Sequence, residues 1–136
     1  MQLTLEQIDV LKVHSFACYP EEACAMLIGQ GDVVENVIVA DNIADDKQHF
    51  FEIDPGARIR MEKRCRETKQ RIIGIFHSHP GGEAKPSQTD EKMVIERHFY
   101  WLIASVTGNG HFELGAFLPR KNQAGFEAVH LSIKEK

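Results

Sequence analysis

Apolar positions recur at helical spacing near the start of the chain. Thr4 and Gln7 have the three-residue separation of a capping box, which places a helix start there. We expect this helix to run toward Cys18, with one face formed by Leu5, Ile8, Leu11 and Ser15. Pro20 favours a further helix start, and the two glutamates after it would complement the dipole of a short second helix.

Runs of apolar and β-branched residues then predict strands. The run 25–28, ending at Gly29, has the pattern of a buried strand. Segments 33–40 and 50–53 favour two more strands, and the polar stretch 41–49 between them is expected to be a loop.

A third helix pattern opens at Asp54-Pro55, as cap and first position, and continues to about Arg71. The apolar run 72–76 predicts a strand that leads directly into His77-Ser78-His79-Pro80. Glycine and proline in the spacer 80–86 require irregular backbone, so the strand should end there.

The remainder of the chain mixes one helix with several strands. Segment 87–99 has a helical pattern, and strands are expected at 101–106, 111–118 and 126–133, joined by Gly-Asn-Gly and Arg-Lys-Asn-Gln turns. Mixed elements with a closing run of mostly antiparallel strands predict an α+β fold in three layers. No repeat or linker divides the chain, so we expect a single domain over residues 1–136.

Composition narrows the function classes. The formal net charge is -4 and no dense stripe of Lys or Arg occurs, which argues against a nucleic-acid partner. No window approaches 18 apolar residues and the first residues lack a secretory pattern, so we expect no membrane association and a cytoplasmic location. The three cysteines form no C-x-x-C pair and should be reduced, so any metal must rely on histidine and carboxylate ligands.

His77 and His79 have the spacing of a ligand pair. Side chains two residues apart on a strand project from the same face, about 6.5–7 Å apart at the backbone, so two imidazoles can converge on one ion. Zinc takes such nitrogen donors together with a carboxylate oxygen, and a catalytic site keeps a fourth position for water. Strand-borne histidine pairs also occur without a metal, so a third ligand has to be found nearby.

Ser87-Gln88-Thr89-Asp90 follows His79 after seven residues and has two readings. Ser-x-x-Asp is an ordinary helix start, in which Ser87 caps the helix and Asp90 complements its dipole without a metal. The spacer can also fold this helix start against the strand end, so that Asp90 supplies a carboxylate ligand and Ser87 directs its hydroxyl toward the site. The two readings can coexist.

Together these residues resemble the signature of the JAMM or MPN-domain metallopeptidases: an upstream Glu, H-[ST]-H, seven residues and S-x-x-D. Glu22, just before the apolar run that ends at Gly29, is similar to the upstream Glu. The resemblance extends through segments 51–55, 73–76 and 101–106, although segment 48–51 has no motif residue to anchor it. It implies a curved, mixed, mostly antiparallel sheet flanked by helices.

The resemblance also implies roles for single residues. His77, His79 and Asp90 would bind one Zn²⁺, Glu22 would be a general base that is not a ligand and contacts the zinc-bound water, and Ser87 would donate to the oxyanion. The alternative for Glu22 is an exposed carboxylate in a first helical turn. Ser78 should face the opposite side of the strand, where we expect a structural hydrogen bond. The remaining histidines, His14, His49, His98, His111 and His130, lack ligand spacing.

The resemblance points to stand-alone prokaryotic members, and so to hydrolysis of a peptide or isopeptide bond at the C-terminal tail of a ubiquitin-like or sulfur-carrier protein, by Glu-assisted attack of zinc-bound water. An extended Gly-Gly-type tail would lie along an exposed strand edge. A catalytically silent MPN scaffold that only binds partners is the alternative. A zinc deaminase is disfavoured because the H-x-E and P-C-x-x-C patterns are missing. The pattern leaves the oligomeric state open.

Overall fold

The computed structural model describes residues 1–94 and 96–134. Within these residues eight strands form one sheet, in the order β7-β6-β5-β4-β2-β3-β1-β8, accompanied by three helices. The strands are β1 (Gln2–Leu3), β2 (Cys24–Gln30), β3 (Val33–Ala40), β4 (Arg71–Pro80), β5 (Tyr100–Val106), β6 (Phe112–Pro119), β7 (Phe126–Val129) and β8 (Ser132–Ile133). The helices are α1 (Leu5–Cys18), α2 (Pro55–Arg66) and α3 (Gln88–Met93).

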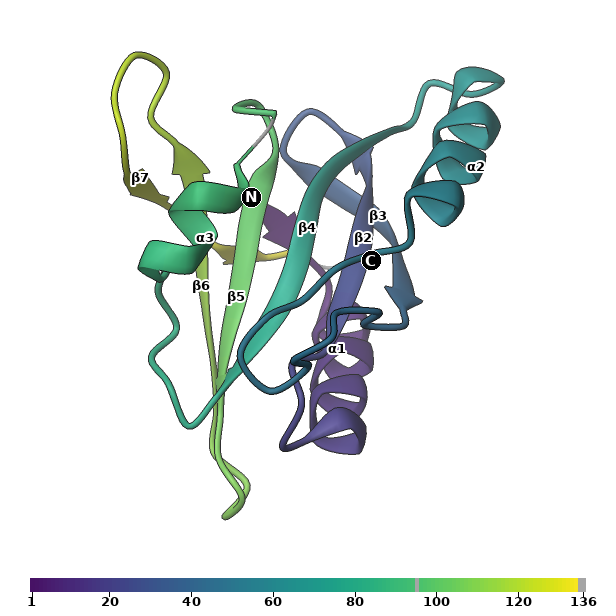
Figure 1. The fold of residues 1–136 in the computed structure, drawn as a ribbon. Helices are drawn as coiled ribbons and strands as arrows, with labels where there is room; N and C mark the ends of the chain where they lie inside the picture. The colour runs from purple at the N-terminus through teal and green to yellow at the C-terminus, as the bar shows by residue number, and fades with distance from the viewer. Residues whose placement is uncertain (95, 135–136) are drawn as a thin grey trace.

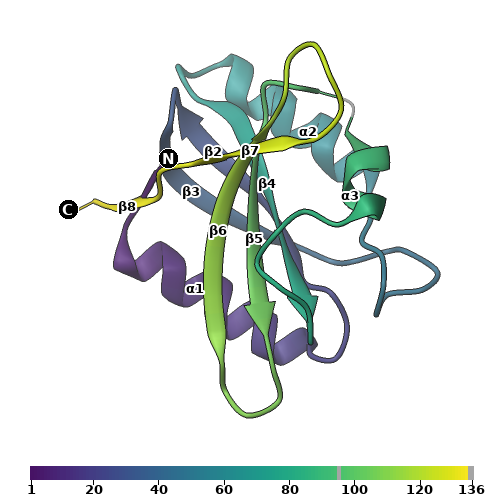
Figure 2. The same ribbon diagram turned by 90° about the vertical axis from the view of Figure 1, so that its left-hand side faces the viewer.

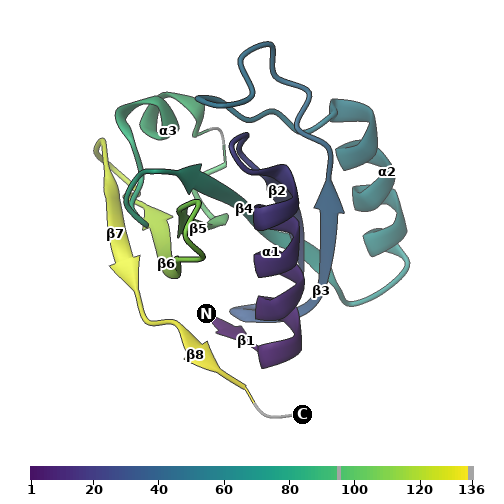
Figure 3. The same ribbon diagram turned by 90° about the horizontal axis from the view of Figure 1, so that it is seen from below.

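The sheet is mixed and curls back on itself. Antiparallel pairing joins β2 to both β3 and β4, and also links β5, β6 and β7, whereas β4 pairs with β5 in parallel. The short β1 runs parallel to both β3 and β8. The strands at the two ends of the order, β7 and β8, are consecutive in the chain, and Figure 3 shows them following one side of the curl. The α+β prediction, with a curved and mostly antiparallel sheet, is therefore confirmed.

Helices cover both faces of the sheet. In Figure 3 α1 lies inside the curl, where Leu11 packs with Leu27 and Phe76. Figures 1 and 2 show α2 and α3 outside the curl, where Cys65 of α2 packs with Met26. Successive side chains of β2 point to opposite faces, and both faces are covered. Residues 24–29 are therefore all buried and apolar, and only Gln30 at the end of the strand is exposed. No helix within the described residues is long and apolar enough to cross a membrane.

The predicted helix starts at Thr4 and Asp54 are both confirmed. Thr4 and Gln7 form the reciprocal capping box of α1, and the Asp54 side chain accepts a hydrogen bond from the Gly56 amide, with proline at the first position of α2. The expected inner face of α1 was wrong at Leu5, which is 62% exposed.

Helix α2 ends at Arg66 rather than near Arg71. Arg71 instead begins β4, and its guanidinium donates to the carbonyl groups of Cys65 and Thr68, which ties the start of the strand to the end of the helix.

Two other elements were predicted wrongly because tertiary hydrogen bonds take their backbone. No helix follows Pro20: the Glu22 amide donates to the Lys47 carbonyl at 2.7 Å, and the chain enters β2 two residues later. Segment 50–53 is not a strand, because the Glu52 amide donates to the Asn42 side chain rather than to a neighbouring strand.

The last two differences concern element length. Helix α3 stops at Met93 instead of continuing to Phe99, and Val94 already has an extended backbone. Beyond it, Glu96 pairs with Arg58 of α2, and Phe99 packs into the cluster beneath α2. The strand expected over 126–133 is divided into β7 and β8, which occupy opposite ends of the sheet order.

Candidate metal centre

A bulge in β4 sets which side chains face the site. Leu27 of β2 pairs with Gly74 and Ile28 with Ile72, so Ile73 is the extra residue and the alternation of side chains shifts there. His77 and His79 then project together on the outer face of the sheet, as their spacing predicted.

Three side chains converge at the end of β4. The Nε2 atoms of His77 and His79 lie 3.0 Å apart. Asp90 Oδ2 lies 3.2 Å from Nε2 of His77 and 3.1 Å from Nε2 of His79. His77 and Asp90 are buried and His79 is nearly so, which removes most of the water that would otherwise solvate these polar atoms. The structure thus brings together the three residues that the sequence predicted as ligands.

The helix-cap reading of Ser87 and Asp90 is confirmed, and the cap leaves Asp90 in contact with both histidines. Asp90 Oδ2 accepts the Ser87 amide at 2.8 Å, and the Asp90 amide donates to Ser87 Oγ at 3.1 Å, which completes a capping box at the start of α3. The same carboxylate contacts both histidines. Ser87 is exposed, and its hydroxyl keeps a hydrogen to donate, so its predicted oxyanion role stays a prediction.

A close backbone approach fixes the spacer that carries the chain from β4 to α3. A Cβ atom at Gly115 of β6 would lie only 2.5 Å from the Ala84 carbonyl oxygen, so only glycine fits at this crossing. The loop also returns the Glu83 carbonyl to His79, whose Nδ1–H donates to it at 2.9 Å. Because a carbonyl can only accept, this bond leaves the Nε2 lone pair of neutral His79 directed at the site.

Glu22 lies at the edge of this cluster and is buried, with 6% of its surface exposed. The exposed first-turn alternative is therefore wrong. Its amide donates to the Lys47 carbonyl, and its carbonyl accepts from the Asn42 side chain at 3.0 Å. Burial raises the pKa of Glu22 to about 7 in the metal-free protein.

Glu22, His77 and His79 also form a possible ligand set, since one ligand atom from each lies within 4.8 Å of the others. Asp90 competes with Glu22 for the third position. We favour Asp90, because its carboxylate is within 3.2 Å of both imidazole nitrogens, whereas the contacts of the Glu22 set extend to longer range. A carboxylate slightly farther away is better placed to act on a water molecule than on the ion itself.

The donor set fits zinc. Ligands about 2.0–2.1 Å from a tetrahedral ion are separated from one another by about 3.3 Å, close to the 3.0–3.2 Å observed here. Two imidazole nitrogens and a carboxylate also match the mixed nitrogen and oxygen sets of catalytic zinc sites. Three atoms that each carry a lone pair lie close together here, and a single cation between them would offset their mutual repulsion.

In the metal-free protein, burial and mutual hydrogen bonds shift the pKa values of His77, His79 and Asp90. Burial lowers the pKa of His77, and Asp90 offsets this only in part. Burial also disfavours charge on His79, but hydrogen bonds to Asp90 and to the Glu83 carbonyl outweigh it, so the net pKa is raised. Burial alone would raise the pKa of Asp90, yet its bonds to both histidines hold that pKa well below the ordinary value.

A family model for prokaryotic homologs of the JAB domain matches residues 5–115. The chain belongs to this family. The resemblance to JAMM or MPN domains drawn from the sequence is thereby confirmed, and the site described above is the part of this JAB-domain protein that carries the motif.

Similar proteins of known name and solved structures of similar fold are consistent with this family. The chain is 27% identical over 112 residues to a CysO-cysteine peptidase of Mycobacterium tuberculosis, covering 81% of this chain and 76% of the relative. It is 28% identical over 91 residues to a desampylase of Haloferax volcanii, covering 65% and 66%. A solution structure from Desulfitobacterium hafniense matches with TM-score 0.86 at 29% identity over 99% and 93% of the two chains. A JAB1/MPN domain protein from Archaeoglobus fulgidus has the same fold, with TM-score 0.65 at 20% identity over 99% and 100%.

Two residues that sequence reasoning missed surround the cluster in this JAB-domain protein. Phe51 stacks on His77, with ring centroids 4.4 Å apart and planes inclined by 15°. Asn42 bonds the backbone of its own loop and of Glu22. Asparagine in a loop often forms hydrogen bonds with nearby backbone groups, but the sequence does not indicate which groups Asn42 contacts.

The predicted structural role of Ser78 is confirmed. Its side chain is buried, and its Oγ accepts the Ala23 amide at 2.8 Å, while the Ala23 carbonyl accepts the Ser78 amide at 3.0 Å. This reciprocal pair joins β4 to the residue that follows Glu22, so it fixes the base candidate against the ligand strand. The cysteines Cys18, Cys24 and Cys65 are all free thiols, as predicted.

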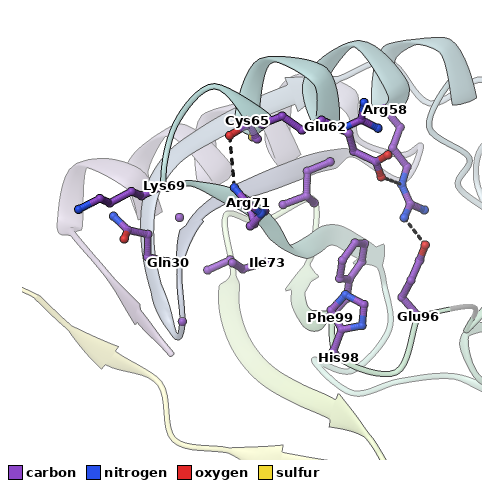
Figure 4. Close-up of a pocket in the computed structure, with 14 residues that line it drawn as sticks. Gln30, Arg58, Glu62, Cys65, Lys69, Arg71, Ile73, Glu96, His98 and Phe99 are labelled. Atoms are coloured by element: carbon purple, nitrogen blue, oxygen red, sulfur yellow. Dashed lines mark hydrogen bonds and ion pairs between the residues drawn. The ribbon is translucent and has the colours of Figure 1, made fainter.

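The metal cluster opens into a groove of about 540 Å³. Segment 48–50 and segment 83–87 contribute to its walls, and Glu22 and His79 reach its lining. This groove is not the largest cavity. A cavity of about 760 Å³ lies at the other end of β4, beside α2 (Figure 4). Two of its cations have partners there: Arg58 pairs with Glu62 and Glu96, and Arg71 bonds backbone carbonyls at the end of α2 and just after it. Among the described residues, the one cluster of potential metal ligands is at the other end of β4.

Proposed function

We propose that the chain is a zinc metallopeptidase that hydrolyses a peptide or isopeptide bond at the C-terminal tail of a ubiquitin-like or sulfur-carrier protein. His77, His79 and Asp90 hold one Zn²⁺ in this proposal, and Glu22 acts as the base. The observation that carries it is the convergence of these four side chains at a groove open to solvent.

The names of the relatives support the substrate class. One relative is a CysO-cysteine peptidase and another a desampylase, and a third, 28% identical over 85 residues, is a probable TtuB-protein conjugate cleaving protease of Thermus thermophilus. Each name describes release of a group joined to a small carrier or modifier protein. The same reaction class is what a metal beside a buried carboxylate can perform.

The groove also supports an extended substrate. We expected the tail to lie along an exposed strand edge, but the edges of the sheet, β7 and β8, are not the strands that carry the ligands. Strand β4 is instead paired with β2 as far as His77 and with β5 as far as Pro80. We therefore place the tail in the groove lined by segments 48–50 and 83–87, which Glu22 and His79 also reach.

The chemistry follows from the positions of the side chains. A bound zinc ion supplies Lewis acidity, which activates water at neutral pH and polarises the scissile carbonyl. The Glu22 carboxylate accepts a proton from the attacking water and then delivers it to the leaving amine. Burial raises the pKa of Glu22 to about 7 in the metal-free protein, and the positive charge of a bound ion would lower it again, which favours the ionised carboxylate that accepts a proton. Ser87 donates its hydroxyl to the oxyanion.

A scaffold that only binds partners is the second candidate, but no ligand of the motif is missing in this chain.

Three free thiols support a reducing compartment such as the cytoplasm.

The test uses the neighbouring glutamates as a matched pair. Zinc-loaded wild type, Glu22→Gln and Glu21→Gln are incubated with a ubiquitin-like protein whose C-terminal Gly-Gly is amide-linked to a reporter. We expect wild type and the Glu21 variant, in which the altered side chain is exposed, to release the reporter. The Glu22 variant should retain zinc and lose about 10²–10⁴-fold in rate. Wild type that binds zinc and cleaves no such tail would favour the scaffold.

A further inference from the structure

The two histidines of the metal centre are oriented in different ways. His79 donates its Nδ1–H to the Glu83 carbonyl. His77 is fully buried, yet its Nδ1 has no hydrogen-bond partner among residues 1–94 and 96–134. Metal-binding histidines almost always use the second ring nitrogen in a hydrogen bond that fixes the tautomer and the ring plane. Something other than a hydrogen bond must therefore hold the imidazole of His77.

Two aromatic rings contact the imidazole of His77. Phe51 stacks on its face, with centroids 4.4 Å apart and planes 15° from parallel. Trp101 meets it edge-on, with centroids 5.5 Å apart and planes at 89°. Phe51 and Trp101 also contact each other edge-on at 6.0 Å. Two mutually perpendicular contacts restrict both the tilt and the rotation of the imidazole.

Phe51 does not belong to the sheet and has to be held in place from its own loop. Asn42 provides this anchor: its Nδ2 donates to the Phe50 carbonyl at 2.9 Å, and its Oδ1 accepts the Glu52 amide at 3.1 Å. The residues on both sides of Phe51 are thus tied to one side chain. The same Nδ2 also donates to the Glu22 carbonyl at 3.0 Å, which connects the loop to the base candidate.

We propose that Phe51 is a positioning residue for the metal centre, which holds the His77 imidazole by stacking in place of the missing hydrogen bond to Nδ1. Phe50 and its neighbours line the groove, so the loop that forms a wall for the substrate also orients a metal ligand. The proposal rests on the proposed function only in requiring that His77 binds the metal.

The experiment measures zinc affinity, by competition with a chromophoric chelator, and does not depend on turnover. Phe51→Leu removes the stack and Phe51→Tyr keeps an aromatic ring. Phe99→Leu is the matched control, because Phe99 has the same exposed fraction, 5%, but packs in the cluster beneath α2. Thermal unfolding of the metal-free proteins reports the loss of packing common to both leucine variants. The visible spectrum of bound Co²⁺ reports ligand geometry.

We expect Phe51→Leu to weaken zinc binding by about 10–100-fold and to change the Co²⁺ spectrum. Phe99→Leu should do neither at a comparable loss of stability, and Phe51→Tyr should recover most of the affinity. Zinc affinity of the Phe51→Leu protein equal to that of wild type would overturn the proposal while leaving the proposed function intact. An equal loss in the Phe99→Leu protein would also overturn it, because the effect would then be general packing.

Discussion

Substitution of the two carboxylates at the cluster separates the two possible ligand sets. Asp90→Asn and Glu22→Gln each remove one negative charge while nearly preserving shape. If Asp90 is the third ligand, the Asn variant loses zinc affinity and the Gln variant does not. If Glu22 is the third ligand, the outcome is reversed, so each protein serves as the control for the other.

The size of the effect can be estimated. Proteins bind structural zinc with apparent free energies of about 10–16 kcal/mol, or roughly 2.5–4 kcal/mol for each of four ligands. Loss of one ligand therefore weakens binding about 10²–10³-fold, since 1.4 kcal/mol is a factor of ten. Asparagine retains an Oδ1 that can accept the Ser87 amide, now bonded to Asp90 at 2.8 Å, so the start of α3 should survive. Glu22→Gln should change the affinity by only a few fold.

The assay is zinc titration in the presence of a competing chelator at pH 7.5. Circular dichroism of the metal-free proteins verifies that both variants fold. Asp90 is not the third ligand if the Asp90→Asn protein binds zinc as tightly as wild type, or if the Glu22→Gln protein loses as much affinity as the Asp90→Asn protein.

Three further outcomes are expected. Zinc affinity should fall at acidic pH by up to about tenfold per pH unit for each imidazole that titrates, because protons compete with the metal, and His79 should titrate first because its pKa is raised. Calorimetry at pH 7.5 and 5.5 measures this, and equal affinities at the two pH values would contradict it. Ser78→Ala should cost about 1–3 kcal/mol in urea unfolding, because the buried Ala23 amide loses its acceptor; unchanged stability would contradict this role. Gly115→Ala should lower stability by about 1–3 kcal/mol, since its Cβ meets the Ala84 carbonyl; an unaltered melting temperature would show that the loop can move freely.

The convergence of the three proposed ligands could be predicted in part because it depends on local geometry. The period of a strand places His77 and His79 on one face, and Ser-x-x-Asp is a helix start whose carboxylate points back along the chain. The strand period and the helix start both depend on neighbouring residues and not on the rest of the fold. The structure adds that one carboxylate both caps the helix and contacts the two histidines, so the proposed ligand role of Asp90 is compatible with its cap role.

The support around the site could not be predicted in this way. Phe51 reaches His77 from a loop, and Asn42 bonds groups up to 20 residues distant, so neither contact has a sequence period. We expected the helix to continue to Phe99, but Val94 is already extended, and the partners of Glu96 and Phe99, which lie at α2, have no local sequence signal. The strands β1 and β8 are two residues each, too short for any alternation to be read.

The most direct test of the account is the location of zinc in crystals of the zinc-loaded protein, from anomalous scattering at the zinc edge. We predict one peak about 2.0–2.2 Å from Nε2 of both histidines, His77 and His79, and from one carboxylate oxygen of Asp90, with a solvent-accessible position left on the ion. A peak bound elsewhere, or one held by the two histidines with Asp90 turned away, would contradict it.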